Sequence, residues 1–353
     1  MASAFTFKVK GQQGTVPSLA FGTATLFDNT IKEAVKTAVR LGYRHIDTAL
    51  LYNNQEAIGD ALEELFRSGD VKREDLFITT KVAFFPPDAT ASNIWVPLSY
   101  HSENRHGYDN VIAGADLCLK KLRLEYVDMM LIHNPATEIQ EYMASMSPHL
   151  FELDDRHGVK WLAGERELII KKRLESLVWD EAKAEAIRAE SWKALEAVRA
   201  AGKAKYIGVS NYPVHLMKAM ETYATVMPAM NELELHPRFS SPALQRHAKE
   251  NGYLLMAYGS GNSQSVKVAK PVAEVAARIG VHAVTVVLKW THQLGVVAIT
   301  RTATESNMRA GLAGVAGKSL TGADMAALSA INEAHPYYWS PMTCQPPGSK
   351  PDL

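Results

Sequence analysis

Eight short apolar runs recur along this chain, and helical patterns separate most of them from one another. The runs cover Ser18–Gly22, Tyr43–Asp47, Leu76–Lys81, Val127–His133, Tyr206–Ser210, Met227–Leu235, Tyr253–Tyr258 and Val296–Thr300. Alternating strands and helices are typical of βαβ units in a parallel sheet. Open sheets usually contain fewer than eight strands. The pattern therefore predicts an α/β fold in which the strands close into a (β/α)8 TIM barrel.

The expected helices show apolar residues at helical spacing between the runs. They cover Ile31–Leu41, Gln55–Phe66, Asp109–Leu122, Asp180–Ala201, Pro213–Tyr223, Pro242–Asn251 and Pro271–Ile279. The last three begin at a proline, which suits the first turn because its missing N–H is not needed there. Ahead of the first run, Phe5–Val16 contains Gly11 and Gly14 and predicts a β-hairpin that plugs the N-terminal end of the barrel.

Two long segments, at about residues 82–108 and 134–179, interrupt the alternation. Each follows an expected strand, so we expect both at the carboxyl ends of the barrel strands. They contribute the aromatic residues Phe84, Phe85, Trp95, Tyr100, Tyr142, Phe151 and Trp161. Loops of this length are usually functional lids or linkers, and the aromatic content favours lids over solvated excursions. We expect a single domain, residues 1–353, that contains both insertions.

The charge balance and the cysteine content limit the classes of partner. Lys+Arg and Asp+Glu both number 38 in 353 residues, which indicates neither a nucleic-acid surface nor an anionic membrane surface. Cys118 and Cys344 are too few for a disulfide framework or a zinc site, and no metal is expected. No apolar stretch has the length of a signal peptide core or a membrane span. We therefore expect a cytoplasmic protein, of open oligomeric state.

Four polar residues lie at or just after the ends of three runs. Asp47 ends the second run, and Tyr52 follows five positions later. Lys81 ends the third run, and His133 ends the fourth. Singly, such residues are more often a cap, a rim aromatic, a solvated charge or a structural histidine. Together at the catalytic face of a barrel, they form a proton-donating set in which a cation acidifies a phenol.

Five short motifs containing these residues follow one another in a fixed order. They are Gly42–Ala49 with Tyr52, Ile78–Lys81, Leu131–Pro135, Gly208–Tyr212 and Asn231–Pro237. In this order they resemble the signatures of the aldo-keto reductase superfamily, and the resemblance runs nearly end to end apart from the insertions and the tail. It implies an oxidoreductase that reduces an aldehyde or ketone to an alcohol by hydride transfer from NADPH.

The resemblance implies a role for each of the four residues. Tyr52 protonates the carbonyl oxygen while a nicotinamide delivers hydride to the carbon. A phenol with its ordinary pKa of about 10 is a poor acid at neutral pH, so Lys81 is expected to lower that pKa. Asp47 holds Lys81 charged and oriented, and His133 hydrogen-bonds the carbonyl.

The resemblance also assigns a coenzyme site. Ser210 and Asn211 are expected to bind the nicotinamide carboxamide, and Tyr258 to stack on the ring. Glu232 replaces the usual Gln; as a carboxylate it would accept from the carboxamide and favour the oxidised ring. Gly22-Thr23 would let the backbone approach the coenzyme. The complete expected set is Gly22, Thr23, Asp47, Ser210, Asn211, Glu232, Tyr258, Gly259, Gly261, Arg301, Thr302, Thr304 and Asn307.

Departures from the family pattern affect coenzyme choice. Arg301-Thr302 stands where the family usually has Lys-Ser on the adenosine 2′-phosphate, and an arginine can still bind phosphate. Asn307 replaces the usual second arginine, and Arg309 is displaced. We expect NADPH as coenzyme, with NADH as an alternative.

Other departures affect the substrate pocket. Ala24, Ala83 and Asn134 stand where the family usually has aromatic walls. Either the pocket is wide, or aromatics of the insertions refill it. Two other functions are weighed: a nucleotide-binding, redox-sensing regulatory subunit with little turnover, and a barrel lyase or hydrolase. The ordered set of four residues disfavours the second.

Overall fold

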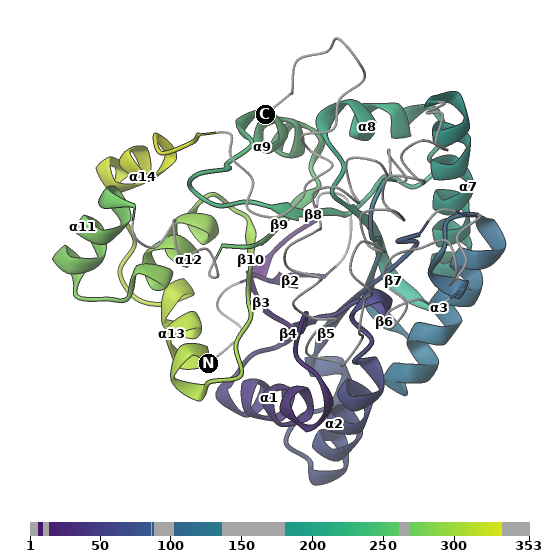
Figure 1. Cartoon of the computed structure of the whole chain (residues 1–353), viewed down its shortest axis with the longest axis horizontal. Coiled ribbons are helices and arrows are strands. Elements are labelled where there is room, and N and C mark those ends of the chain that lie inside the picture. Colours follow the sequence, from purple (N-terminus) through teal and green to yellow (C-terminus); the bar gives the residue numbers. More distant parts are fainter. Residues whose placement is uncertain are drawn as a thin grey trace, which may run out of the picture.

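Eight parallel strands form a closed barrel at the centre of the molecule (Figure 1). The computed structural model describes residues 6–9, 14–85, 87, 102–135, 181–260 and 269–333. The barrel strands are β3 (Leu19–Gly22), β4 (His45–Asp47), β5 (Phe77–Val82), β6 (Val127–Ile132), β7 (Ala204–Ser210), β8 (Met230–Glu234), β9 (Leu254–Tyr258) and β10 (Val297–Thr300). All eight predicted runs are confirmed as strands, and β10 pairs with β3 to close the barrel.

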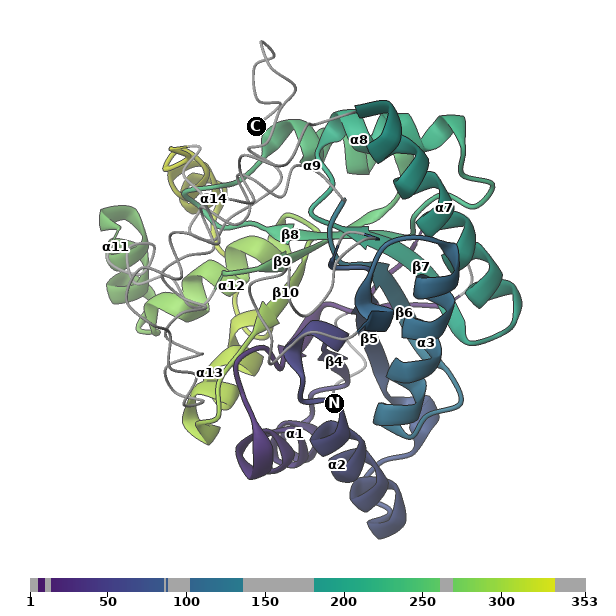
Figure 2. The same ribbon diagram turned by 45° about the vertical axis from the view of Figure 1, so that its right-hand side comes forward.

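Helices surround the barrel on the outside (Figures 1 and 2). They are α1 (Asp28–Leu41), α2 (Gln55–Ser68), α3 (Tyr108–Leu122), α7 (Glu181–Ala200), α8 (Val214–Ala219), α9 (Pro242–Asn251), α11 (Lys270–Ile279), α12 (Ala283–Gln293), α13 (Glu305–Val315) and α14 (Gly322–Ser329). The seven predicted helices are confirmed, although α8 ends early and continues as the short helix η6 (Met220–Thr222). Helices α12, α13 and α14 were not expected from the sequence.

Helix α12 lacked a clear signal because it is buried nearly all round. Its residues from Thr285 to Thr291 are all buried, so no polar face alternates with an apolar one. Several of them are β-branched, which lowers helix propensity. Among the described residues no single helix has the length and apolar character of a membrane span; α11 and α12, bent by 99°, reach it only as a pair, by length and composition.

The inside of the barrel is apolar at the end where the strands begin. Successive residues of a strand point to opposite faces, so Met129, Met230 and Met256 point inward while their neighbours pack against the helices. The predicted hairpin is confirmed as β1 (Thr6–Phe7) paired antiparallel with β2 (Val16–Pro17). Val16 is fully buried within the inner cluster, so the hairpin closes this end. The inward-pointing polar residues therefore lie at the opposite end of the barrel, where the strands finish.

Close packing of α2 against α3 gives a test of the outer layer. A Cβ on Gly59 would collide with the carbonyl oxygen of Lys121, so Gly59→Ala should lower the free energy of unfolding by about 1–3 kcal/mol. Alanine is more favourable than glycine in a helix by about 1 kcal/mol. The loss from the collision should exceed this gain. The matched control is Gly322→Ala in α14, where nothing lies within 4 Å of the added Cβ. Denaturant unfolding should show destabilisation for the first variant only; equal stability of the two would contradict the packing.

Candidate active site

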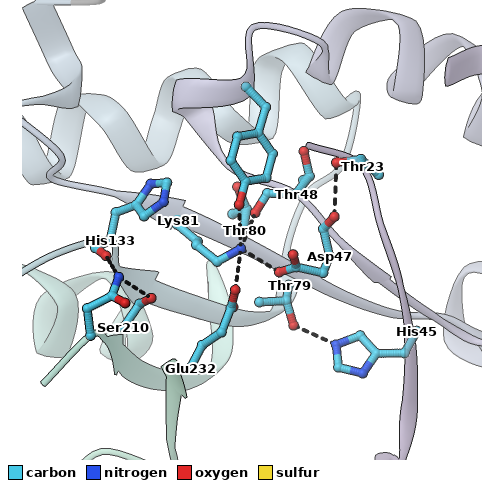
Figure 3. Close-up of polar contacts among 12 residues, drawn as sticks. Thr23, His45, Asp47, Thr48, Thr79, Thr80, Lys81, His133, Ser210 and Glu232 are labelled. Atoms are coloured by element: carbon cyan, nitrogen blue, oxygen red, sulfur yellow. Dashed lines mark hydrogen bonds and ion pairs between the residues drawn. The ribbon is translucent and has the colours of Figure 1, made fainter. Parts of the chain in front are cut away.

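The ammonium group of Lys81 lies at the centre of the barrel mouth (Figure 3). Lys81 is fully buried, and its Nζ lies 2.6 Å from Asp47 Oδ1 and 3.1 Å from Glu232 Oε1. The same nitrogen donates to the Thr48 carbonyl oxygen at 3.2 Å and to Tyr52 Oη at 3.3 Å. A buried charge is tolerated only when it is paired and hydrogen-bonded. These contacts supply both requirements.

Strand register brings the groups together. Asp47 pairs with Thr79 across β4 and β5, and Lys81 points inward two residues later on the same face as Thr79. Tyr52 follows in the short helix η2 (Leu50–Tyr52), which ends at Asn53 in a left-handed conformation with φ of 50°. Glu232 reaches Lys81 from β8. Asp47 and Tyr52 therefore meet at the ammonium group of Lys81, as the sequence predicted, and Glu232 contacts the same group.

His133 completes the group that the sequence predicted. It directly follows β6, and its backbone N–H donates to Val82 O at 2.7 Å. Its ring lies edge-on to Tyr52, with centroids 5.8 Å apart, and 4.9 Å from the ring of Phe84. Burial, assisted by the charge of Lys81, holds the pKa of His133 well below its usual range. The imidazole is therefore neutral at neutral pH and can donate one N–H.

The expected acidification of Tyr52 is not what the structure shows. Burial of the hydroxyl raises the pKa of Tyr52 above its ordinary value, and the charge of Lys81 offsets only part of that rise. The carboxylates of Asp47 and Glu232 add to it. The expectation of a lowered pKa was wrong for this state of the protein, because desolvation outweighs the nearby cation. Tyr52 is thus a neutral phenol that retains its proton.

The two carboxyl groups and the ammonium are electrostatically linked. Burial opposes the charge on Lys81, but Asp47 and Glu232 outweigh it and raise the pKa of the ammonium above its usual range. Burial also raises the pKa of Asp47, against the effect of Lys81. For Glu232, burial and then the charge of Asp47 raise the pKa to about 8. The cluster therefore holds one cation beside two carboxyl groups whose ionisation burial opposes.

Ser210, Asn211 and Tyr258 lie beside this cluster at the ends of β7 and β9. Asn211 has a φ of 64°, and its Nδ2 donates to Ser210 Oγ and to the His133 carbonyl oxygen, both at 3.0 Å. Tyr258 Oη donates to Asn211 Oδ1 at 2.8 Å. The structure thus brings three of the expected coenzyme residues together next to His133.

The Gly22-Thr23 turn has a different explanation from the one that the sequence suggested. A Cβ on Gly22 would lie 2.6 Å from Ile299 Cγ2, so packing against β10 already requires glycine. Thr23 is buried and donates from Oγ1 to the Asp47 carbonyl oxygen at 2.9 Å. Gly259 follows β9 with a φ of 80°. Gly261 lies outside the described residues.

A separate polar group follows β10 at the start of α13. Arg301 is partly buried, and its Nη1 donates to the Ala24 carbonyl oxygen at 3.3 Å. Thr302 Oγ1 accepts from the Thr304 backbone at 3.1 Å and from Asn307 Nδ2 at 3.4 Å. These expected residues share one surface.

The displaced Arg309 is bound to Glu305. Its Nε and Nη2 lie 2.9 Å and 2.7 Å from Glu305 Oε1. Its charge is therefore paired within α13.

Asn134 joins the bases of the two insertions. It is buried, its Nδ2 donates to the Phe84 carbonyl oxygen at 2.8 Å, and its Oδ1 lies 3.3 Å from His106 Nε2. His106 Nδ1 in turn lies 3.0 Å from Ser191 Oγ in α7. From the sequence, Asn134 was expected only in the substrate pocket. In the structure, both the nitrogen and the oxygen of its side-chain amide have protein partners.

Ala24 and Ala83 are the other two residues that were expected in the substrate pocket. Ala83 is fully buried with a left-handed φ of 59°, and Ala24 is partly buried. Phe84, the next residue after Ala83, packs on His133 and so places one aromatic of the first insertion at the site. Phe85 is also described. The remaining aromatic residues of the insertions lie outside the described residues, namely Trp95, Tyr100, Tyr142, Phe151 and Trp161. Most of the expected lid lies outside them as well.

Two contacts were missed at the sequence level. The Thr48 carbonyl oxygen binds Lys81, which no side-chain motif signals. Glu232 was identified, but only as a partner of the carboxamide and not of Lys81. Its alternation with Met230 places it on the inward face of β8, one layer above the apolar interior, and that pattern could have indicated the contact.

Comparisons with known proteins agree on one family. The sequence profile described as Aldo/keto reductase family matches residues 18–265. A D-galacturonate reductase of Hypocrea jecorina is 32% identical over 300 residues, covering 84% of this chain and 82% of that protein. An NAD(P)H-dependent D-xylose reductase of Candida tenuis is 28% identical over 300 residues, covering 81% and 80%. A crystal structure of a Bombyx mori aldo-keto reductase in complex with NADP superposes with a TM-score of 0.69 at 23% identity, covering 94% of each chain.

The stability of the buried cluster is testable by removing its cation. Lys81→Met should lower the free energy of unfolding by about 3–5 kcal/mol at pH 8, because it leaves carboxyl groups buried without a counter-charge. The loss should be smaller at pH 5, where carboxyl groups of raised pKa take up protons. Denaturant titrations at both pH values measure this. The double variant Lys81→Met/Asp47→Asn should recover part of the loss at pH 8; no recovery would contradict the pairing.

Proposed function

The chain belongs to the aldo/keto reductase family, and we propose that it reduces an aldehyde or ketone to an alcohol with hydride from NADPH and a proton from Tyr52. The observation that carries this proposal is the contact between Lys81 Nζ and Tyr52 Oη at 3.3 Å, with Asp47 Oδ1 2.6 Å from the same nitrogen. An amine that contacts both an acid and a phenol at the mouth of a barrel forms a proton-donating group with them.

Tyr52 acts as the general acid. It remains protonated at neutral pH because its pKa is raised, so the proton is present when a carbonyl arrives. Transfer of that proton to the carbonyl oxygen breaks the Tyr52 O–H bond and forms the O–H bond of the alcohol. The phenolate that remains lies beside the Lys81 ammonium, which stabilises its charge in a site of low dielectric. A proton from solvent then restores the phenol.

His133 orients the carbonyl. Its neutral imidazole lies edge-on to the Tyr52 ring and can donate an N–H to the same oxygen that receives the proton. Phe84 also packs on this imidazole, with ring centroids 4.9 Å apart. Two donors that meet at one oxygen set the direction from which the carbonyl carbon is approached.

The residues present fit a nicotinamide coenzyme. Glu232 Oε2 is buried and has no hydrogen-bond partner among the described residues, and Glu232 pairs in register with Ser210 on β7. An amide NH₂ placed there would satisfy that oxygen. When bound, the coenzyme would supply the hydride for the carbonyl carbon. Arg301, at the start of α13, would hold the adenosine 2′-phosphate.

The names of the relatives guide the choice of substrates for a first assay. Two relatives are named as reductases of D-galacturonate and of D-xylose, a sugar acid and a sugar. We propose to begin with that class and with simple aromatic aldehydes, which separate a polar pocket from an apolar one.

The proton donor is tested by Tyr52→Phe. This variant keeps the ring packed against His133 but removes the hydroxyl, so kcat for carbonyl reduction should fall by about 10²–10⁴-fold. NADPH affinity, measured by fluorescence titration, should change little. The matched control is Tyr126→Phe, because Tyr126 lies under Arg73 and Lys205, away from the cluster, and should keep full activity. Near-normal turnover by Tyr52→Phe would refute the assignment.

Coenzyme choice is tested by Arg301→Ala. If Arg301 holds the 2′-phosphate, its loss should weaken NADPH binding by about 10–100-fold and NADH binding much less. Arg309→Ala is the control, since Arg309 is already paired with Glu305 and should matter little. Titrations of both coenzymes against all three proteins measure this. Equal losses for NADPH and NADH would show that the phosphate is bound elsewhere.

A further inference from the structure

The catalytic ammonium is held by two carboxyl groups instead of one. Asp47 and Glu232 lie 2.6 Å and 3.1 Å from Lys81 Nζ, and both are almost completely buried. The family resemblance expects an uncharged Gln at position 232. This chain therefore places an additional ionisable group in direct contact with the residue that polarises the proton donor.

Among the described residues, Lys81 is the one cation that contacts Glu232, and it also contacts a second acid. The titratable groups of the described chain that interact with Glu232 are Lys81 from β5, Asp47 from β4 and Tyr52 from η2. On the two strands that pair with β8, the residues in register with Glu232 are Ser210 and Met256, both uncharged. Glu234, two residues along the same strand, is bound to His236 at 2.9 Å.

A second carboxylate in this place would carry an unbalanced charge. Lys81 is already satisfied by Asp47 at the shorter distance, so ionisation of Glu232 changes the cluster from neutral to negative. Burial and the charge of Asp47 oppose that ionisation and raise the pKa of Glu232 to about 8. The change in charge therefore falls near physiological pH, close to the reacting groups.

We propose that Glu232 is a titrating positioning residue that sets how strongly the site prefers oxidised over reduced coenzyme and how readily Tyr52 donates its proton. As a carboxylic acid it resembles glutamine in shape and charge, and the site favours carbonyl reduction. As a carboxylate it competes for Lys81, opposes proton release from Tyr52 and favours the positively charged oxidised nicotinamide. This inference rests on the proposed function.

The two effects of the carboxylate act on different steps, one on proton donation by Tyr52 and one on coenzyme binding. A negative charge beside Tyr52 raises the free energy of the phenolate that proton donation produces, because like charges repel strongly at low dielectric. The same charge attracts a cationic nicotinamide ring and not a neutral one. Reduction consumes one carbonyl, one NADPH and one proton and yields one alcohol and one NADP⁺. The carboxylate form therefore slows proton donation in carbonyl reduction, and it binds the oxidised coenzyme more tightly relative to the reduced one.

The decisive experiment compares the binding of oxidised and reduced coenzyme. Fluorescence titrations at pH 6 and pH 9 give the ratio of the Kd of NADP⁺ to the Kd of NADPH, in which titration of the shared 2′-phosphate cancels. In the wild-type protein this ratio should fall by about tenfold between the two pH values, equivalent to about 1.4 kcal/mol. In Glu232→Gln, which imitates the protonated acid, it should stay constant. Glu234→Gln, on the same strand, should retain the wild-type response.

Kinetics give a second readout. The kcat for reduction should fall above about pH 8 in the wild-type protein, with KM for the carbonyl less affected. In Glu232→Gln this limb of the profile should be flattened. A role in folding alone would not change the pH profile in this way.

A third readout uses stability without coenzyme. The pKa of Glu232 is about 8 in the folded protein and ordinarily 4.5, so between these values the folded state holds a proton that the unfolded chain releases. The free energy of unfolding should therefore fall as pH rises from 4.5 to 8 through this group. Glu232→Gln lacks this proton and should show a smaller fall over that window.

The outcomes separate this inference from the proposed function. The same pH dependence of the Kd ratio in wild type and Glu232→Gln would overturn the inference, even if the enzyme reduces carbonyls. A wild-type protein that binds NADPH but reduces no carbonyl at any pH would instead refute the proposed function. Should the Gln variant fail to fold, Glu232→Met tests the same loss of charge. A pH-dependent ratio in that variant would likewise overturn the inference.

Discussion

The buried charge of Lys81 is the interaction on which the mouth of the barrel depends. An ammonium without access to water must be paired, and here Asp47, Glu232, the Thr48 carbonyl and Tyr52 surround it. Lys81 lies on β5, and these partners come from β4 and the residue after it, from β8 and from η2. A shift of one residue in the register of any of these strands would turn its side chain out of the barrel. The electrostatic requirement and the strand register therefore support each other.

The barrel separates its stabilising half from its reactive half along each strand. On β8, Met230 points into the apolar interior that Val16 of the hairpin closes, and Glu232 points the same way one layer higher. On β5, Phe77 likewise points into the apolar interior, and Lys81 points the same way nearer the end of the strand. Apolar burial at one end thus compensates for the cost of burying charges at the other.

The bases of both insertions are connected to the site by one hydrogen-bonded group. Asn134 follows His133 directly and binds the Phe84 backbone and His106, which contacts Ser191 of α7. Phe84 also packs on the His133 ring. The His133 imidazole is therefore in contact with a residue at the base of the first insertion, and Asn134 connects that base to the base of the second.

The sequence by itself determined the eight strands, seven of the helices, the hairpin and the meeting of Asp47, Tyr52, Lys81 and His133. These features follow from local periodicity and from the order of motifs, which the chain carries whatever its surroundings. Helix α12 was missed because burial on all sides removes its polar face. Only the tertiary structure decided the raised pKa of Tyr52 and the contact of Glu232 with Lys81. Both depend on desolvation and on distances between strands far apart in sequence, and neither leaves a periodic signal.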